Sequence, residues 1–173
     1  MITKFDKYNE SVRDLMTPKS EEDIKIALSK LHPMDMIIRG IDRNIPWLVK
    51  KGIEYLETSP SLYKKDIPGI LQNIGDFHIR KAIDRNDIEI ISYLIEAGYK
   101  IQRRDIDYAV AHSNIEMIKL LINGGAVINN DLVNQAMLFR TKRPEMNNEE
   151  VIKLLKKHNV DSKINKLKNI LRP

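Results

Sequence analysis

The amino-acid sequence predicts an all-α protein built as a solenoid of stacked helical repeats. The first observation is internal repetition, since residues 82–101 align with residues 109–128 at an offset of 27 residues. The second is the spacing of apolar residues at i, i+3 and i+4 in each copy, which places them on one face of a helix. The third is a Gly or Asn after the last apolar residue of a copy, where helices commonly end. One copy cannot bury its apolar face alone, so this repetition predicts a stack.

Each repeat divides into two short helices. In the best preserved copy we expect the first helix over 106–112 and the second over 115–123, with a two-residue turn between them. Gly124 and Gly125 then end the second helix, because glycine readily adopts the left-handed backbone conformation. Gly98 stands in the same place one repeat earlier.

Two further copies are less regular. A third begins at Ala136 and resumes over 149–160 after seven additional residues, with Asn159 in the place of the glycine. A degenerate copy precedes the regular ones, because residues 41–44 (IDRN) repeat the letters of residues 83–86. The sequence therefore predicts three recognisable repeats and one degenerate repeat.

The N-terminal part differs from the repeats. We expect residues 1–20 to form a flexible N-terminal segment and residues 21–75 a divergent helical region that includes the degenerate copy. Prolines interrupt this region at Pro33, Pro46, Pro60 and Pro68. Because proline ends or starts helices, the region should consist of several short helices with one longer connection near 57–67.

The C-terminal end carries the chain's excess positive charge. Residues 151–173 hold seven Lys or Arg and one Asp, whereas residues 1–150 hold 22 basic and 23 acidic residues. Apolar residues fall on one helical face at Ile164, Leu167, Ile170 and Leu171. A terminal repeat needs a polar outer surface, so residues 161–173 are predicted to form a capping helix that follows the repeats at 76–160.

The repeats resemble the ankyrin repeat family. The first-helix pattern L-x-x-A-A is matched at 79–83, 106–110 and 133–137, the second-helix pattern L-E-V-V-K-L-L at 88–94 and 115–121, and the ending G-A-D-V-N at 125–129. The T-P-L-H tetrapeptide of the family is absent, and each repeat is about six residues shorter than the usual length of about 33. The missing residues belong to the β-hairpin finger, so we expect reduced or absent fingers, with Arg103 and Arg104 in the shortened one.

The resemblance implies non-catalytic binding of another protein through a concave surface made by fingers and first helices. Tyr108 with neighbouring Arg104 has the composition of an interface hot spot. Carried over position by position, the partner-binding residues are Arg80, Lys81 and Asp84 in the first repeat, Asp107, Tyr108 and Ala111 in the second, Asn134, Gln135 and Leu138 in the third, and Arg103 and Arg104 in the finger.

Nothing in the sequence favours catalysis, a cofactor or a metal. The chain has no cysteine, which excludes thiolate chemistry and disulfides and suits an intracellular, cytoplasmic location. Its four histidines (His32, His78, His112 and His158) have no metal-ligand spacing, and no phosphate-binding glycine motif is present. No apolar run is long enough to cross a membrane, and the first residues lack a secretory signal.

Two alternatives stay open. The basic C-terminal end could bind nucleic acid, although few aromatic residues accompany it for base stacking. The first ten residues, which include Phe5 and Tyr8 and end at Glu10 before Ser11, resemble the N-terminal peptides that large tailed phages attach to capsid-packaged proteins. The second alternative implies a viral or phage protein that acts on a host or virion partner.

Overall fold

The computed structural model describes residues 31–58, 66–112, 114–142 and 149–159. Within these ranges the backbone forms helices, turns and loops, and none of the residues lies in a β-strand. The prediction of an all-α chain with ankyrin-like helix pairs and without hairpin fingers is therefore confirmed for the described residues. The chain separates into two compact units between Ile67 and Pro68, and each is described by itself. The predicted domain boundaries near residues 20, 75 and 160 stay predictions.

Unit 1 contains one helix pair, α3 (Pro33–Arg43) and α4 (Pro46–Thr58). Both begin with proline, whose fixed φ suits the first turn of a helix. The two helices approach closely at two glycines. A Cβ on Gly40 would lie 2.6 Å from the Cγ2 atom of Val49, and a Cβ on Gly52 would lie 2.8 Å from a backbone oxygen of α3. Glycine at these positions is what allows the two helices to pack at this distance.

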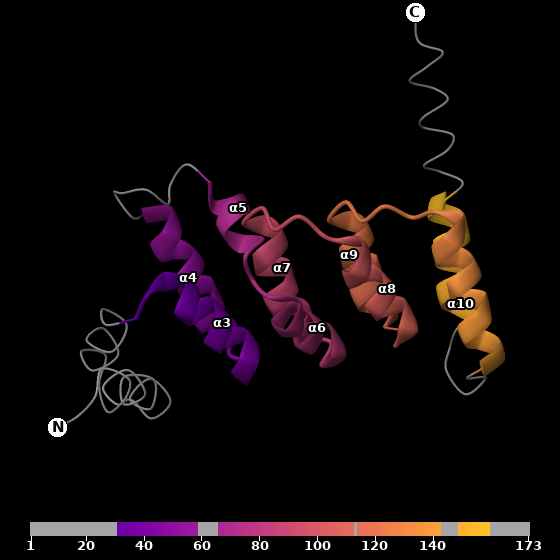
Figure 1. Cartoon of the computed structure of the whole chain (residues 1–173), viewed down its shortest axis with the longest axis horizontal. Coiled ribbons are helices and arrows are strands. Elements are labelled where there is room, and N and C mark those ends of the chain that lie inside the picture. The colour runs from indigo at the N-terminus through magenta and orange to yellow at the C-terminus, as the bar shows by residue number, and fades with distance from the viewer. Residues whose placement is uncertain (1–30, 59–65, 113, 143–148, 160–173) are drawn as a thin grey trace, which may run out of the picture. The chain divides into compact units, whose positions relative to one another are not determined.

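Unit 2 is a stack of helix pairs that follow one another in chain order (Figure 1). The first helices contact each other, since α8 touches both α6 and α10, and the second helices α7 and α9 also touch. This arrangement makes two layers, one of first helices and one of second helices. The elements are α5 (Ile67–Leu71), α6 (Asp76–Asp84), α7 (Ile88–Glu96), α8 (Arg103–Ala111), α9 (Ile115–Asn123), α10 (Asn130–Lys142) and the helical residues 149–159.

The core of unit 2 lies between the two layers, and the same positions of each sequence repeat contribute to it. The apolar positions at i, i+3 and i+4 are buried in each repeat, as the periodicity predicts. They are Ile79, Ala82 and Ile83 on α6, Ile106, Ala109 and Val110 on α8, and Leu132, Val133 and Ala136 on α10. On the second helices they are Ile90, Ile91 and Leu94, then Met117, Ile118 and Leu121, then Val151, Ile152 and Leu155.

The turns also repeat. Asn44 after α3 and Asn86 after α6 both have φ = 56°, so the shared IDRN letters mark the same left-handed turn in both units. Gly98 and Gly125 after the second helices have φ of 94° and 100°, as the helix-end prediction requires. Asn159, predicted to take this place in the third copy, lies within the helical stretch 149–159.

Two helix bounds correct the prediction. Helix α8 begins at Arg103, so Arg103 and Arg104 lie in its first turn and not in a finger. The cause is a cap: the backbone N–H of Gln102 donates to Oδ2 of Asp105 at 2.8 Å, which starts the helix three residues before its first apolar position. Helix α10 continues to Lys142, so part of the additional sequence between Ala136 and residue 149 extends the first helix of the third copy. The predicted segments 1–20 and 161–173 lie outside the described residues.

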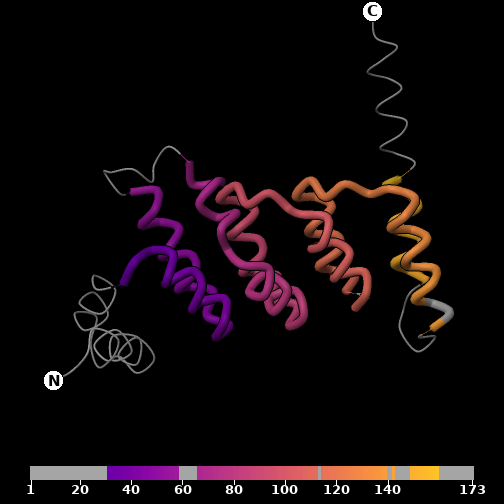
Figure 2. The backbone as a smooth tube through the Cα atoms, viewed as in Figure 1, coloured from indigo at the N-terminus to yellow at the C-terminus, as the bar shows by residue number. Residues whose placement is uncertain are grey.

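The connections from one pair to the next, residues 97–102 and 124–129, run along the same side of unit 2 (Figure 2). Each has six residues, too few to build a two-stranded finger. The short turns within the pairs lie at the opposite ends of the helices. The first-helix layer is thus exposed without projecting loops beside it.

Candidate protein-binding surface

Two rows of polar side chains face each other across the first helices α6 and α8. Their spacing at i, i+4 and i+8 places each row on one face of its helix. We name these residues the α6–α8 ladder: Asp76, Arg80 and Asp84 on α6, Arg104 and Tyr108 on α8, and His112 at the C-cap of α8.

Each step of the ladder joins the two helices. Arg104 forms an ion pair with Asp76. The Arg80 guanidinium lies 4.9 Å from the centroid of the Tyr108 ring, a cation–π distance. The Tyr108 hydroxyl donates to Oδ2 of Asp84 at 3.1 Å. His112 completes the row, with its Nε2 atom 3.1 Å from the other carboxylate oxygen of Asp84.

The ladder encloses little space. A hollow between its steps has a volume of about 10 Å³, enough for about one water molecule. It is lined by Asp76, Arg80, Ile83, Arg104, Asp105 and Tyr108. Exposed ion pairs of this kind contribute about 0–1 kcal/mol each. The ladder therefore aligns two repeats and presents a closely packed polar surface with no cavity for a small molecule.

A buried polar cluster adjoins the ladder, because Asp105 follows Arg104 in the chain and lines the same hollow. Asp105 is 5% exposed, and its Oδ2 accepts hydrogen bonds from the Tyr99 hydroxyl at 3.0 Å and from the Gln102 N–H at 2.8 Å. Burial raises the pKa of the Asp105 carboxyl above its ordinary value, and the two hydrogen bonds oppose that rise. Burial and the neighbouring Asp105 charge likewise raise the pKa of Tyr99.

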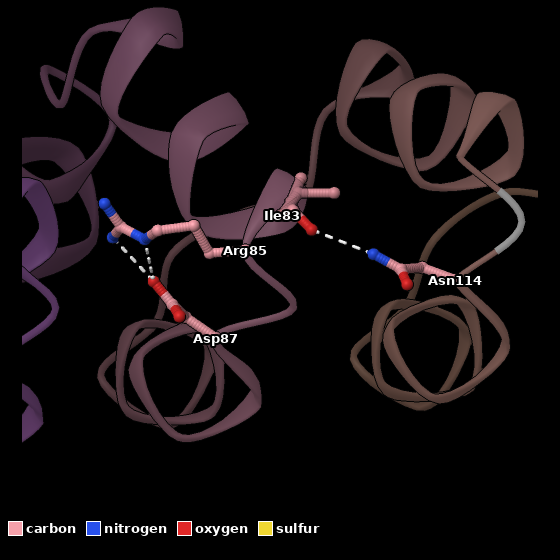
Figure 3. Close-up of polar contacts among 4 residues, drawn as sticks. All are labelled: Ile83, Arg85, Asp87 and Asn114. Carbon is pink, nitrogen blue, oxygen red and sulfur yellow. Dashed lines mark hydrogen bonds and ion pairs between the residues drawn. The ribbon is translucent and has the colours of Figure 1, made fainter.

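A hydrogen bond between repeats lies at the turn between α8 and α9 (Figure 3). The Asn114 side-chain N–H donates to the backbone oxygen of Ile83 at 3.0 Å, from the α8–α9 turn to the end of α6. One repeat earlier the matching residue is Asp87, which accepts two hydrogen bonds from Arg85 at 2.8 and 2.6 Å. The same turn position thus makes a contact within its own repeat at Asp87 and a contact to the preceding repeat at Asn114.

All eleven residues predicted to bind a partner lie on first helices, and none is buried. The structure brings four of them together in the ladder, namely Arg80, Asp84, Arg104 and Tyr108. It pairs Arg103 with Asp107, whose side chains are 2.7 Å apart. Lys81 lies 5.8 Å from the Phe77 ring centroid, and Ala111 is half-buried. The remaining three lie on α10: Asn134 and Leu138 are exposed and Gln135 is half-buried.

Three residues of this surface were not predicted. Asp76 and His112 complete the ladder, and Phe77 on α6 is 68% exposed. The signal for the first two was the i+4 spacing, which continues from Arg80 to Asp76 and from Tyr108 to His112. Phe77 lies two residues before Ile79, the first buried residue of α6, and no sequence pattern marked it.

The paired helices, their two layers and the repeated turns define a helical-repeat protein. Residues 79–122, from α6 to α9, match the family model for ankyrin repeats (many copies). These residues belong to the ankyrin repeat family, whose members are usually non-catalytic binding scaffolds for other proteins. A search of curated proteins and a search of solved structures each found no match.

Two further findings concern the described part of the chain. It contains no group of three or more His, Asp or Glu side chains placed to hold a metal ion. None of its helices has the length and apolar character needed to cross a membrane. The segments behind the two alternative functions, residues 1–10 and 161–173, lie outside the described residues.

Proposed function

We propose that this chain is a non-catalytic ankyrin-repeat protein that binds another protein through the exposed faces of its first helices. The observation that carries the proposal is the placement of all eleven predicted residues at the surface of one layer, formed by α6, α8 and α10. The surface is polar and closely packed, which suits contact with a folded or extended protein over a broad area.

The ladder separates residues that hold the repeats together from residues that can contact a partner. Arg104 and Tyr108 join α8 to α6, so substituting them would disturb the stack as well as the surface. Arg103 and Asn134 are exposed and lie outside the ladder. They are therefore the positions at which a change should affect a partner and leave the fold intact.

The test uses a charge-matched pair of variants. A partner is first captured from the source organism on the intact chain, identified and purified, and its Kd is then measured. The Arg103→Glu/Asn134→Glu variant should weaken binding tenfold or more, because new carboxylates replace groups that contact the partner. The control, Lys119→Glu/Asn123→Glu, makes the same charge change on exposed positions of α9 in the second layer. Equal binding by both variants would refute the proposal.

Nucleic-acid binding by the basic C-terminal end is the second candidate. The observation in its favour is the exposure of Lys153, Lys156 and Lys157 on the helical residues 149–159. It requires retention on DNA or RNA that falls steeply with salt and vanishes when 161–173 are deleted.

A capsid-packaged viral protein is a finer version of the proposal. It requires mature chains that begin at Ser11, which intact-mass measurement detects. Chains that retain residues 1–10 in purified virions would rule it out.

A further inference from the structure

One position of the first helix changes from buried to exposed at the last repeat. Ile83 on α6 and Val110 on α8 are both 0% exposed, whereas Met137, which occupies the same position on α10, is 45% exposed. The adjacent Leu138 is 60% exposed. Ile83 is covered by the following repeat, because it shares the ladder hollow with residues of α8. Met137 therefore marks an apolar position of α10 that a following repeat would cover, whereas the position of Leu138 is also exposed in the first repeat, at Asp84.

The described part of the chain ends next to the start of α10. The Asn159 side-chain N–H donates to Oδ1 of Asn130, the first residue of α10, at 2.7 Å. Asn159, the last described residue, therefore lies next to the end of α10 at which that helix begins. In the preceding repeats the chain leaves the second helix at the same end and enters the next first helix, as from α9 to α10. The 14 residues from 160 to 173 follow the second helix in the sequence, as a first helix does in the preceding repeats.

The sequence of this segment has the register of a first helix. Gly98 precedes Ile106 by eight residues, and Gly125 precedes Val133 by eight. Asn159 aligns with these glycines in the sequence, although it is the last residue of the helical stretch 149–159, and counting eight from it gives Leu167. Ile170 and Leu171 then occupy the positions of Ala109 and Val110, so all three apolar positions of a first helix are filled.

We propose that residues 160–173 are the first half of a fourth repeat and dock along α10, covering Met137. Nine residues of helix, the length of α6 or α8, span about 14 Å, and the distance along α10 from Asn130 to Leu138 is about 12 Å. The tether is short, so the segment is present at an effective concentration in the millimolar range, well above that of a second copy or another protein.

Disulfide trapping in the full chain tests the docking, because the chain has no cysteine of its own. In this register Asn134 and Asn169 correspond to Arg80 and Tyr108, which touch across α6 and α8. The Asn134→Cys/Asn169→Cys variant should form an intrachain disulfide under mild oxidation, detected as a monomer that is lighter by two hydrogen atoms. The control, Lys119→Cys/Asn169→Cys, places the first thiol on α9 and should stay reduced.

A stability measurement complements the trapping. Leu167→Ala should lower the Tm by roughly 5 °C or more, because it removes a large buried side chain, whereas Lys168→Ala should leave it unchanged. Disulfide-linked dimers in place of monomers would identify a second copy as the occupant and overturn the proposal. Failure to crosslink together with an unchanged Tm for Leu167→Ala would also overturn it.

Discussion

Asp105 offers the sharpest test of how the repeats are held together. Both of its hydrogen bonds, from Tyr99 and from Gln102, end on the same oxygen, Oδ2. The carbonyl oxygen of an asparagine can accept both of them, whereas alanine can accept neither. Comparing the two substitutions therefore separates the effect of the hydrogen bonds on stability from the effect of the charge.

The expected magnitudes differ clearly. Asp105→Ala leaves two donors without their acceptor, and a buried unsatisfied donor costs about 1–3 kcal/mol. The hydrogen bond from the Gln102 N–H to Asp105 also caps the N-terminus of α8. The total loss in the free energy of unfolding should therefore be about 2–4 kcal/mol. Asp105→Asn keeps the bonds and removes a buried charge, so its free energy of unfolding at about pH 7 should stay within about 1 kcal/mol of wild type.

The contribution of Asp105 to the free energy of unfolding changes with pH in a defined direction. Burial raises the pKa of Asp105, so the folded protein binds its proton more tightly than the unfolded chain. The contribution of Asp105 to stability is fully present below the ordinary Asp pKa of about 3.9 and is lost as pH rises through the raised value. Wild type should therefore gain stability relative to Asp105→Asn as the pH falls from about 7 to about 4.

Urea denaturation followed by circular dichroism at both pH values measures these differences. An Asp105→Ala variant within about 0.5 kcal/mol of wild type would refute the structural role of the cluster. If wild type instead loses stability relative to Asp105→Asn on acidification, the pKa of Asp105 is not raised in the folded protein and the reasoning is refuted.

Two further predictions concern the turns. Asn114→Ala removes the hydrogen bond to the backbone oxygen of Ile83 and should lower the free energy of unfolding by about 1–2 kcal/mol in urea denaturation; no loss would mean that the bond does not join the repeats. Gly125→Ala should cost about 1 kcal/mol, since φ is 100° and nothing lies within 4 Å of an added Cβ. Gly98→Ala should cost more, because its Cβ would also lie 2.8 Å from the Cγ of Pro68; equal losses in the same assay would exclude the steric contact.

The sequence predicted the elements whose signal is local. The second helix at 115–123 has the predicted bounds, because apolar spacing and a terminal glycine both mark it. The start of α8 was missed because its first turn is polar, with two arginines and no apolar residue. The capping pair Gln102 and Asp105 was the signal present there, and a Gln cap is weaker than the usual Ser, Thr or Asp.

In the candidate surface, too, local features could be predicted from the sequence and contacts between repeats could not. Helical spacing identified which residues of α6 and α8 are exposed, since exposure depends on the face of a single helix. The partner of each residue across the ladder could not be predicted, because it depends on how two repeats pack. Arg104 meets Asp76, which lies 28 residues earlier, one residue more than the repeat offset. Tyr99 was missed because a lone aromatic in a connection has no periodicity.

Hydrogen exchange with and without the purified partner tests the central claim most directly. The account predicts slower amide exchange on partner binding in α6, α8 and α10, with α7 and α9 unchanged, because only the first-helix layer is proposed to contact the partner. Protection confined to α7 and α9, or to the helical residues 149–159, would contradict it.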